Sequence, residues 1–401
     1  MKVLVLNCGS SSLKYQFFDT EQKLALANGV VERIGMSGAV LTHSRYDGDT
    51  VSIVGEILDH SIAIEYVLAV MLSKNHGVIE DKDDIDAVGH RVVHGGEAFS
   101  DSVLITDEVM RVLQENIELA PLHNPPNIKG IQACKRVIPE TPQVGVFDTA
   151  FHANMPSHAF LYGIPYELYK RHKIRRYGFH GTSHRFVSNS AAEMLGKPLS
   201  ELKIITAHLG NGCSMAAING GFSVDTSMGF TPLEGLLMGT RAGDIDPSVI
   251  LYIMGKEGLS LSEASTLLNK HSGLIGISGE SSDMREVIAS MNEGNKRSKI
   301  AFNIFVYRIK KYIGSYAAAM GGLDALVFTG GIGENATDIR TEVCRDMEFF
   351  GIELDPERNA KKEILISKDS AKTKVLRIPT NEELVIALDT AVIVETAKKE
   401  M

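Results

Sequence analysis

The stretch that decides the fold is Val5-Leu-Asn-Cys-Gly-Ser-Ser-Ser-Leu-Lys-Tyr-Gln16, in which apolar residues flank a run of small ones. This pattern is typical of a strand, a tight turn and a second strand. A similar stretch, Ala207-His-Leu-Gly-Asn-Gly-Cys-Ser-Met-Ala-Ala-Ile218, lies about half a chain later, and superposing the two places Ser12 on Ser214. We therefore expect two copies of one structural plan, with chance similarity between two turns as the alternative.

A second pair of stretches supports the duplication. Ile85-Asp-Ala and Leu323-Asp-Ala each begin an apolar run that ends at a Gly-Gly pair, and the separation is far too long for a solenoid. Strand and helix patterns alternate along the chain, which indicates an α/β fold. Two similar lobes would enclose a cleft, the usual place for a ligand. The patterns predict strands at 3–6, 13–18, 85–93, 143–147, 204–209 and 323–329, and helices at 59–75, 107–119, 297–320 and 383–398.

Composition limits the class of protein. The chain has 401 residues, 44% of them apolar and 23% charged, as expected for two globular domains. Its net charge of -9 disfavours nucleic acid as a partner, although one basic patch on an acidic body stays open. No run of about 18 apolar residues indicates a membrane span. Residues 1–7 favour a buried strand over a signal peptide. Four scattered cysteines indicate reduced thiols, hence a cytoplasmic protein.

Three glycine-rich turns suggest phosphate or nucleotide binding. In Asn7–Lys14, backbone N–H groups and hydroxyls can approach phosphate oxygens, and Lys14 adds a charge. His208–Cys213 is the matching turn in the second copy, and Gly331–Asn335 follows a strand and precedes a helix. A Walker A loop, G-x-x-x-x-G-K-[ST], is absent from the sequence. Each turn is weak evidence by itself, and together they favour a nucleotide site.

A series of longer motifs gives the most specific signal, and together they resemble the acetate kinase family. They occur in that family's order over nearly the whole chain. These motifs are Leu6–Lys14, His90–Gly96, Phe147–His152, Tyr177–His184, His208–Gly212, Asp225–Gly229, Gly239–Asp244, Thr329–Asn335 and Pro379–Glu383.

The resemblance implies a fold and an activity. The fold is the duplicated actin-like and sugar-kinase (RNase H-like) plan, with an N-terminal lobe of residues 1–149 plus 383–401 and a nucleotide-binding lobe of residues 150–382. The activity is reversible, direct in-line transfer of a phosphoryl group from ATP to acetate, which gives acetyl phosphate and ADP. Mg²⁺ is the expected cofactor, with Mn²⁺ as a substitute, and a homodimer is expected from the resemblance alone. Propionate kinase is the nearest alternative.

Five residues are the candidates for catalysis. A phosphoryl transition state needs cations around its oxygens, and guanidinium groups match phosphate and carboxylate well, which favours Arg91 and Arg241 over simple surface ion pairs. The resemblance places His180 at the transition state, His123 beside the substrate and Asp148 among the catalytic residues. His180 and His184 have the spacing of a zinc pair, but H-E-x-x-H is missing and Gly181-Thr-Ser predicts a turn there.

Oxygen ligands for the metal are available at Asn7, Asp148 and Glu382. Thr380-x-x-Glu383 fits a capping box, which predicts Thr380 as the N-cap of the last helix and Glu383 as its partner. That leaves Glu382 for the metal, where the resemblance also places a glutamate. The alternative is that both glutamates only complement the helix dipole. The sequence therefore predicts Asn7 and Glu382 as the metal ligands.

The resemblance also gives the binding residues. Arg91, Val93, Leu122, Phe179 and Pro232 would bind the acid, in a pocket where one methylene is worth only roughly 1–3 kcal/mol; in the alternative, the four apolar residues are plain core. Two alternative functions remain. An actin-like structural or chaperone ATPase would not need the two arginines, and a metallohydrolase would need a cluster of metal ligands. The expected nucleotide-binding residues are Ser10, Ser12, Lys14, His208, Leu209, Gly210, Asn211, Gly212, Asp283, Met284, Arg285, Gly331, Ile332, Gly333, Glu334 and Asn335.

Overall fold

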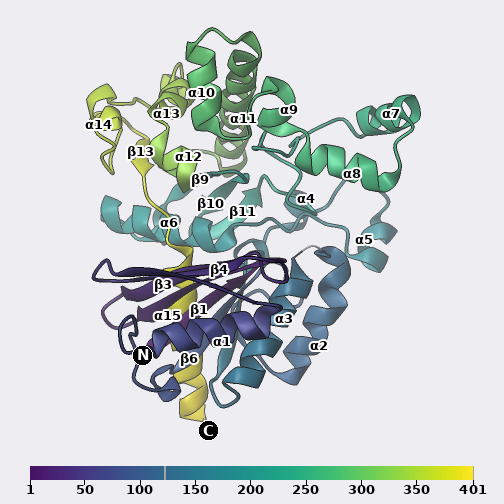
Figure 1. Ribbon diagram of the computed structural model, residues 1–401. Coiled ribbons are helices and arrows are strands. Elements are labelled where there is room, and N and C mark those ends of the chain that lie inside the picture. The colour runs from purple at the N-terminus through teal and green to yellow at the C-terminus, as the bar shows by residue number, and fades with distance from the viewer. Residues whose placement is uncertain (122, 401) are drawn as a thin grey trace. The chain divides into compact units, whose positions relative to one another are not determined.

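The computed structural model describes residues 1–121 and 123–400 and divides into two compact units (Figure 1). Unit 1 comprises Met1–Ala153 and Asn381–Met401, and unit 2 comprises Asn154–Thr380. The boundaries expected from the sequence, at 149/150 and 382/383, fall within a few residues of these. Among the described residues, no helix is long and apolar enough to cross a membrane.

Unit 1 is built on one sheet with the strand order β5-β4-β3-β2-β1-β6-β8-β7. Helices α1 and α3 cover one face and α15 covers the other, each over an apolar core (Figure 1). The strands are β1 Lys2–Cys8, β2 Ser12–Asp19, β3 Leu24–Glu32, β4 Ala39–Arg45, β5 Thr50–Gly55, β6 Ala87–Val92, β7 Val103–Leu104 and β8 Gln143–Phe147. The helices are α1 His60–Met71, η1 Lys82–Asp84, α2 Asp107–Glu115, η2 Asn116–Leu119, α3 Asn124–Val137, η3 Ala150–His152 and α15 Glu382–Glu400.

Unit 2 is built on a smaller sheet with the order β11-β10-β9-β12-β13, against which α6 and the long helix α11 pack. Its strands are β9 Lys203–Leu209, β10 Cys213–Asn219, β11 Phe222–Thr226, β12 Ala325–Thr329 and β13 Lys374–Arg377. Its helices are α4 Ser157–Phe160, α5 Tyr166–His172, α6 Gly181–Leu195, η4 Leu199–Glu201, α7 Pro247–Glu257, α8 Leu261–Lys270, α9 Gly273–Ser278, α10 Met284–Asn292, α11 Lys296–Met320, α12 Gly330–Asn335, α13 Thr337–Cys344, η5 Glu348–Phe350 and α14 Pro356–Ala360.

The predicted α/β fold with two similar halves is confirmed. The order β3-β2-β1-β6-β8 in unit 1 matches β11-β10-β9-β12-β13 in unit 2, with three antiparallel strands followed by two parallel ones in each. One pair of hydrogen bonds is repeated as well. Lys2 N–H donates to Asp86 Oδ2 (2.6 Å) and Asp86 N–H to Lys2 O (3.0 Å). Lys203 and Asp324 make the same two contacts at 2.8 Å each.

The superposition expected from the sequence is nevertheless wrong by one residue. Because Lys2 and Lys203 occupy equivalent positions, the counterpart of His208 is Asn7, one residue later than the sequence match had it. The second strand is shifted further, since the hairpin has four residues between the paired Cys8 and Leu13, and only three between Leu209 and Cys213. The counterpart of Ser214 is therefore Lys14, and not Ser12.

Most of the predicted elements form, and two local predictions are wrong. The long helix α11 ends at the left-handed Gly321, and the capping box Ser260–Glu263 opens α8, both as predicted. Residues 330–335 form the helix α12 where the sequence predicted a turn, and α6 begins at Gly181 where a turn was also predicted. Gly330 has φ +74°, and a Cβ there would lie 2.8 Å from Leu209 O. Only glycine allows α12 to approach β9 so closely.

Candidate active site

In unit 1, Arg91 and Asp148 form a buried ion pair. Arg91 lies near the end of β6 and Asp148 directly follows the parallel neighbour β8, so both side chains emerge at the carboxyl edge of the sheet. Asp148 is 1% exposed; it accepts hydrogen bonds from Arg91 Nε at 3.0 and 3.2 Å and from Nη2 at 2.7 Å. The charge of Asp148 raises the pKa of Arg91 further above its ordinary value. Asp148 therefore holds Arg91, and its proposed part in metal binding stays a prediction.

The capping box predicted for the last helix is wrong. Asn381 caps α15, because its Oδ1 accepts from the N–H of Leu384 at 3.0 Å. The Thr380 hydroxyl instead contacts Ser183 Oγ at 2.8 Å. Glu383 is thus one residue too early to pair with the cap, and the capping argument no longer separates it from Glu382. Both glutamates lie in the first turn of α15.

Electrostatics separates the two glutamates instead. Burial raises the pKa of Glu382 to about 7, and the charges of Asp148 and Glu383 contribute in the same direction. The nearby Arg91 opposes this rise but does not cancel it. Burial thus disfavours the charged form of Glu382, and a cation bound beside the carboxylate would stabilise that form.

The turn between β1 and β2 lies beside a hollow of about 310 Å³ in unit 1. Asn7 and Lys14, which pair across the hairpin, line the hollow together with Glu383, Gln16 and Asn28. The turn itself is closed by a hydrogen bond from Gly9 N–H to Ser12 O at 2.8 Å, with Ser10 exposed at its tip. The structure thus places two predicted binding residues, Asn7 and Lys14, on one surface with Glu383.

The segment after β6 holds the remaining candidates of unit 1. Val93 N–H donates to Asn127 Oδ1 at 3.1 Å, and Asn127 Nδ2 donates to Cys8 O at 3.0 Å, which ties this segment to the end of β1. His123 directly precedes α3. Burial lowers the pKa of His94 to about 4, and His123 adds to the effect, so the two rings are near each other. Leu122 lies outside the described residues.

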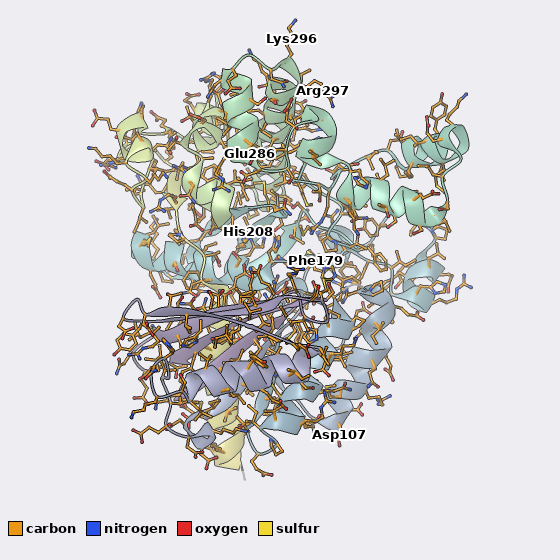
Figure 2. The ribbon with its side chains drawn as sticks, in the orientation of Figure 1. Asp107, Phe179, His208, Glu286, Lys296 and Arg297 are labelled. Carbon is orange, nitrogen blue, oxygen red and sulfur yellow. The ribbon has the colours of Figure 1, made fainter. Side chains whose placement is uncertain are left out.

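In unit 2, the predicted His180 is held in a network of histidines and hydroxyls. His180 has φ +56° and directly precedes α6. Its Nδ1 contacts Ser214 Oγ at 2.9 Å, and its ring stacks on His208 with centroids 4.3 Å apart. Ser214 Oγ also contacts His184 Nε2 at 2.8 Å, so this hydroxyl bridges the two histidines of the i, i+4 pair. Figure 2 labels His208 and Phe179, the chain neighbour of His180.

Arg241 lies beside these histidines. A Cβ built on Gly212 would be 3.5 Å from both Arg241 Nη1 and His180 Cε1, so the turn between β9 and β10 touches both side chains. Arg241 Nη1 donates to Pro232 O at 3.0 Å and approaches Met238 Sδ at 3.7 Å. Among the described residues it has no carboxylate partner, and burial lowers its pKa. A half-buried cation without a protein anion is suited to an anionic ligand.

The predicted acid pocket is not contained in one unit. Phe179, 3% exposed, and Pro232 belong to unit 2, where both lie next to catalytic candidates. Val93 belongs to unit 1. The binding of the acid by these apolar residues therefore remains a prediction.

A pocket of about 840 Å³ in unit 2 brings together three predicted nucleotide-binding segments. It lies between the β9–β10 turn, the start of α10 and the helices α12 and α13. Of the predicted residues, those that line it are Gly210, Asn211, Asp283, Met284, Arg285, Gly331, Ile332 and Asn335. Segments far apart in the sequence thus form a single cavity within the volume range of small-molecule sites.

Two predicted residues of α12 face away from this pocket because the segment is helical. Glu334 Oε1 accepts from the N–H groups of Gly330 (3.1 Å) and Thr380 (3.3 Å). Gly333 packs on β9, where a Cβ would lie 3.5 Å from Ala207 O. Neither residue lines the pocket, so Glu334 stabilises the fold at this point.

Sequence reasoning missed other parts of the lining, among them Ser282, Ile288 and Lys362. Lys362 Nζ lies 3.4 Å from Asn335 Oδ1. The backbone of Lys362 is left-handed, with φ +55°. No sequence signal marks this lysine among its charged neighbours. Ile288 was detectable, since it lies one helical turn after Met284.

Comparison with known proteins decides the family. The sequence model of the Acetokinase family matches residues 2–388. The chain belongs to the acetokinase family. It is 56% identical to the acetate kinase of Treponema denticola over 98% of this chain and 100% of that protein. It is also 56% identical to the acetate kinase of Halothermothrix orenii over 99% and 100%.

Solved structures agree with this assignment. The acetate kinase of Porphyromonas gingivalis matches with a TM-score of 0.95 and 50% identity, over 98% of this chain and 99% of that one. A propionate kinase from Francisella tularensis matches with a TM-score of 0.92 and 43% identity, over the same shares. Proteins named for two different acids thus share this fold.

Proposed function

We propose that this acetokinase-family member transfers the γ-phosphoryl group of ATP to acetate, reversibly, to give acetyl phosphate and ADP. The observation that carries the proposal is Arg241, a half-buried guanidinium with no carboxylate partner among the described residues, beside His180 and the β9–β10 turn. An anion is needed there, and both the carboxylate of acetate and the transferring phosphoryl group are anions. The acetate kinases named above support this choice of acid.

The proposed reaction is a direct displacement. An oxygen of the acetate carboxylate forms a bond to the γ-phosphorus, and the bond to the oxygen bridging the β- and γ-phosphorus atoms breaks, so that ADP leaves with that electron pair. Arg91 and Arg241 bind and orient the anionic groups, and stabilise charge on the phosphoryl oxygens. Asp148 holds Arg91 in a fixed orientation through three contacts. His180, held by Ser214, donates to the transferring group, and His123 lies beside the acid.

The adenine nucleotide is proposed to bind in the 840 Å³ pocket of unit 2. Ile332 and Met284 offer apolar contact for the base, and Asp283 and Asn335 offer polar contacts for the sugar. The turns Gly210–Gly212 and Ser10–Lys14 are the proposed phosphate contacts, together with His208 and Leu209. A structural ATPase would have no need of Arg91 and Arg241 at a site for an acid, so these two residues do not support that alternative.

Mg²⁺ is the proposed cofactor, with Mn²⁺ as a substitute that prefers the same oxygen ligands. The residues present fit such an ion, because burial raises the pKa of the Glu382 carboxyl to about 7, and a bound cation would stabilise its charged form. Asn7 adds an amide oxygen on the surface shared with Glu383. Mg²⁺ needs few protein ligands, because it keeps several waters. When bound, the ion neutralises charge on the nucleotide phosphates.

The test is to trap acyl phosphate as the hydroxamate, with ATP and acetate, propionate or butyrate side by side. We expect the wild-type protein to prefer acetate and to need a divalent metal. Arg241→Ala should lower kcat by roughly 10³, as for other arginines that act in phosphoryl transfer, without a loss of fold by circular dichroism. A wild-type protein that forms no acyl phosphate from any of the three acids would refute the proposal.

Propionate kinase is the second candidate, because a propionate kinase is among the similar structures. The two candidates differ only in the acid pocket, and a higher kcat/KM for propionate than for acetate in the same assay would decide for it. The mechanism would be unchanged.

Two further proposals concern assembly and location. We propose a homodimer on the resemblance to the family; in unit 2, α7 has no buried residue among its described ones, and Leu251 and Tyr252 are exposed. Light scattering of the wild type and of Leu251→Asp would test whether this surface binds a second copy. We propose a cytoplasmic location, supported by four buried cysteines that form no disulfide.

A further inference from the structure

The loop that presents Arg241 is closed at its base by one aspartate. Asp244 N–H donates to Gly235 O at 2.9 Å, and Gly235 N–H donates to Asp244 Oδ1 at 2.9 Å. The two ends of the segment 235–244 are thus joined by a reciprocal pair of hydrogen bonds. Gly235 and Gly243 have φ values of +111° and +71°, which give the chain the sharp bends that this closure requires.

The other carboxylate oxygen of Asp244 fixes the loop to the long helix α11. Tyr312 Oη donates to Asp244 Oδ2 at 2.8 Å, and Arg308 Nη1 lies 3.8 Å from the same oxygen. Burial raises the pKa of Tyr312, and the charge of Asp244 raises it further, so the phenol keeps its proton and donates. Helix α11 has a buried face of ten residues that includes Phe305, Ile309 and Ile313, which makes it a rigid support.

Arg241 lies in a tight turn inside this loop. Met238 N–H donates to Arg241 O at 3.2 Å, and Met238 is fully buried. The guanidinium then reaches Pro232 O at 3.0 Å. Rotation of the loop about its base would move the guanidinium away from Pro232 and from the β9–β10 turn, although no bond of Asp244 reaches Arg241 itself.

We propose that Asp244, held by Tyr312, is a positioning residue that sets the place and orientation of the Arg241 guanidinium for phosphoryl transfer. The inference rests on the proposed function and on the part that Arg241 takes in it. Asp244 touches neither substrate nor nucleotide in this scheme; its two oxygens fix the loop, and the loop fixes the arginine. A displacement of about 1 Å in a positioned group can lower a rate by about 10²-fold.

The test is a double-mutant cycle between Asp244→Ala and Arg241→Ala. We expect Asp244→Ala to lower kcat by between ten- and a hundredfold, with a smaller change in KM for ATP. Within the described chain, no residue of the segment 235–244 lines the proposed nucleotide pocket, and the loop is joined to that lining by the bond from Gly239 N–H to Asn211 O. In the Arg241→Ala background the same change should lower kcat no further, because the group that it positions is already gone. Asp244→Asn keeps an oxygen for Gly235 N–H and should recover most of the activity.

Tyr312→Phe gives a second, milder variant, which keeps the ring and removes only the hydroxyl. It should lower kcat by a few-fold, also only while Arg241 is present, and it keeps the proposal testable if Asp244→Ala does not fold. The matched controls are Tyr307→Phe, an exposed tyrosine on α11, and Asp246→Asn, which caps α7 two residues after Asp244. Both controls should keep wild-type kcat.

The outcomes separate the two proposals. Equal fractional losses in the wild-type and Arg241→Ala backgrounds would mean that Asp244 supports the fold in general, and would overturn the positioning role. So would a folded Asp244→Ala with wild-type kcat. A wild-type protein that makes no acyl phosphate would overturn the proposed function, and this inference with it. An active wild type whose Arg241→Ala form keeps kcat within tenfold would overturn this inference and the role proposed for Arg241, while the proposed reaction itself would stand.

Discussion

The substitution Asp148→Asn tests the electrostatic centre of unit 1. The carboxylate of Asp148 binds both Nε and Nη2 of Arg91, and Asp148 is 1% exposed. An asparagine can accept through only one atom, and its amide N–H₂ would face the guanidinium donors. Arg91 would therefore lose one side of a two-point contact and its nearest counter-charge.

The expected cost follows from the burial of the pair. Breaking a buried ion pair by removing one partner costs about 3–5 kcal/mol. The side chain of Arg91 is 25% exposed and keeps the nearby charges of Glu382 and Glu383, so we expect about 2–3 kcal/mol. For a protein of 401 residues that is a fall in Tm of roughly 2–4 °C. The misoriented guanidinium should also lower kcat by about 10²-fold.

The assay combines thermal melting with hydroxamate formation from acetate. Arg111→Ala is the matched control, because Arg111 also pairs with carboxylates in unit 1, Glu108 and Glu115, but on an exposed surface. Exposed pairs contribute about 0–1 kcal/mol, so this control should melt and turn over like the wild type. Asp148→Asn should in addition shift the titration of Glu382 to lower pH, because the charge of Asp148 helps to raise the pKa of that group.

An Asp148→Asn protein with unchanged kcat would show that Arg91 does not depend on this carboxylate. A loss of stability equal to that of Arg111→Ala would refute the burial argument. If kcat fell but the titration of Glu382 did not shift, the result would agree with Asp148 orienting Arg91. It would contradict the prediction that the charge of Asp148 raises the pKa of Glu382.

Three further predictions follow from unit 1. The pKa of Glu382 is raised to about 7 from an ordinary value near 4.5, so its contribution to stability is full below pH 4.5 and is lost as pH rises through 7. We expect this contribution to be about 1–3 kcal/mol. Melting of the metal-free Glu382→Gln variant should show a flat pH profile, and a slope like that of the wild type would contradict the prediction. Asn381→Ala should lose about 1 kcal/mol as a cap does and keep most activity, and a melting temperature equal to the wild type would exclude a capping role. Val93→Ala should raise the ratio of kcat/KM for propionate over acetate by several-fold, since each buried methylene is worth about 0.8 kcal/mol; an unchanged ratio would place the pocket elsewhere.

The sequence predicted those parts of the site that follow from strand ends and turns. Arg91 and Asp148 end neighbouring parallel strands, so the rule that parallel strands end at one edge was enough to bring them together. Part of the pocket proposed for the nucleotide was likewise predicted from its glycine-rich turn, whereas the residues at the start of α10 came only from the family resemblance. These features depend on local patterns that one topology brings together.

The errors occur where tertiary contacts decide between local alternatives. Thr380 fitted the capping pattern as well as Asn381 did, but its hydroxyl is engaged by Ser183. The Gly331–Asn335 segment fitted a turn, but close packing on β9 through Gly330 makes it a helix, which turns Glu334 away from the pocket. The spacing of residues in the sequence predicts neither outcome. The first depends on Ser183, which is far from Thr380 in the sequence, and the second depends on packing against the separate strand β9.

The duplicated plan allows the Arg91–Asp148 pair to be compared with its counterpart in unit 2. By strand register, the counterpart of Arg91 in unit 2 is Thr329, because each lies beside the strand that leads into the small-residue turn. The counterpart of Asp148 is Thr380, since Gly145 and Arg377 take equivalent places on β8 and β13. One copy of the fold thus forms with two neutral threonines where the other has a buried ion pair. Since buried ion pairs contribute little net stability, and the same plan folds without one, the needs of the fold do not explain the charges in unit 1, and the proposed binding of an anion by Arg91 would explain them.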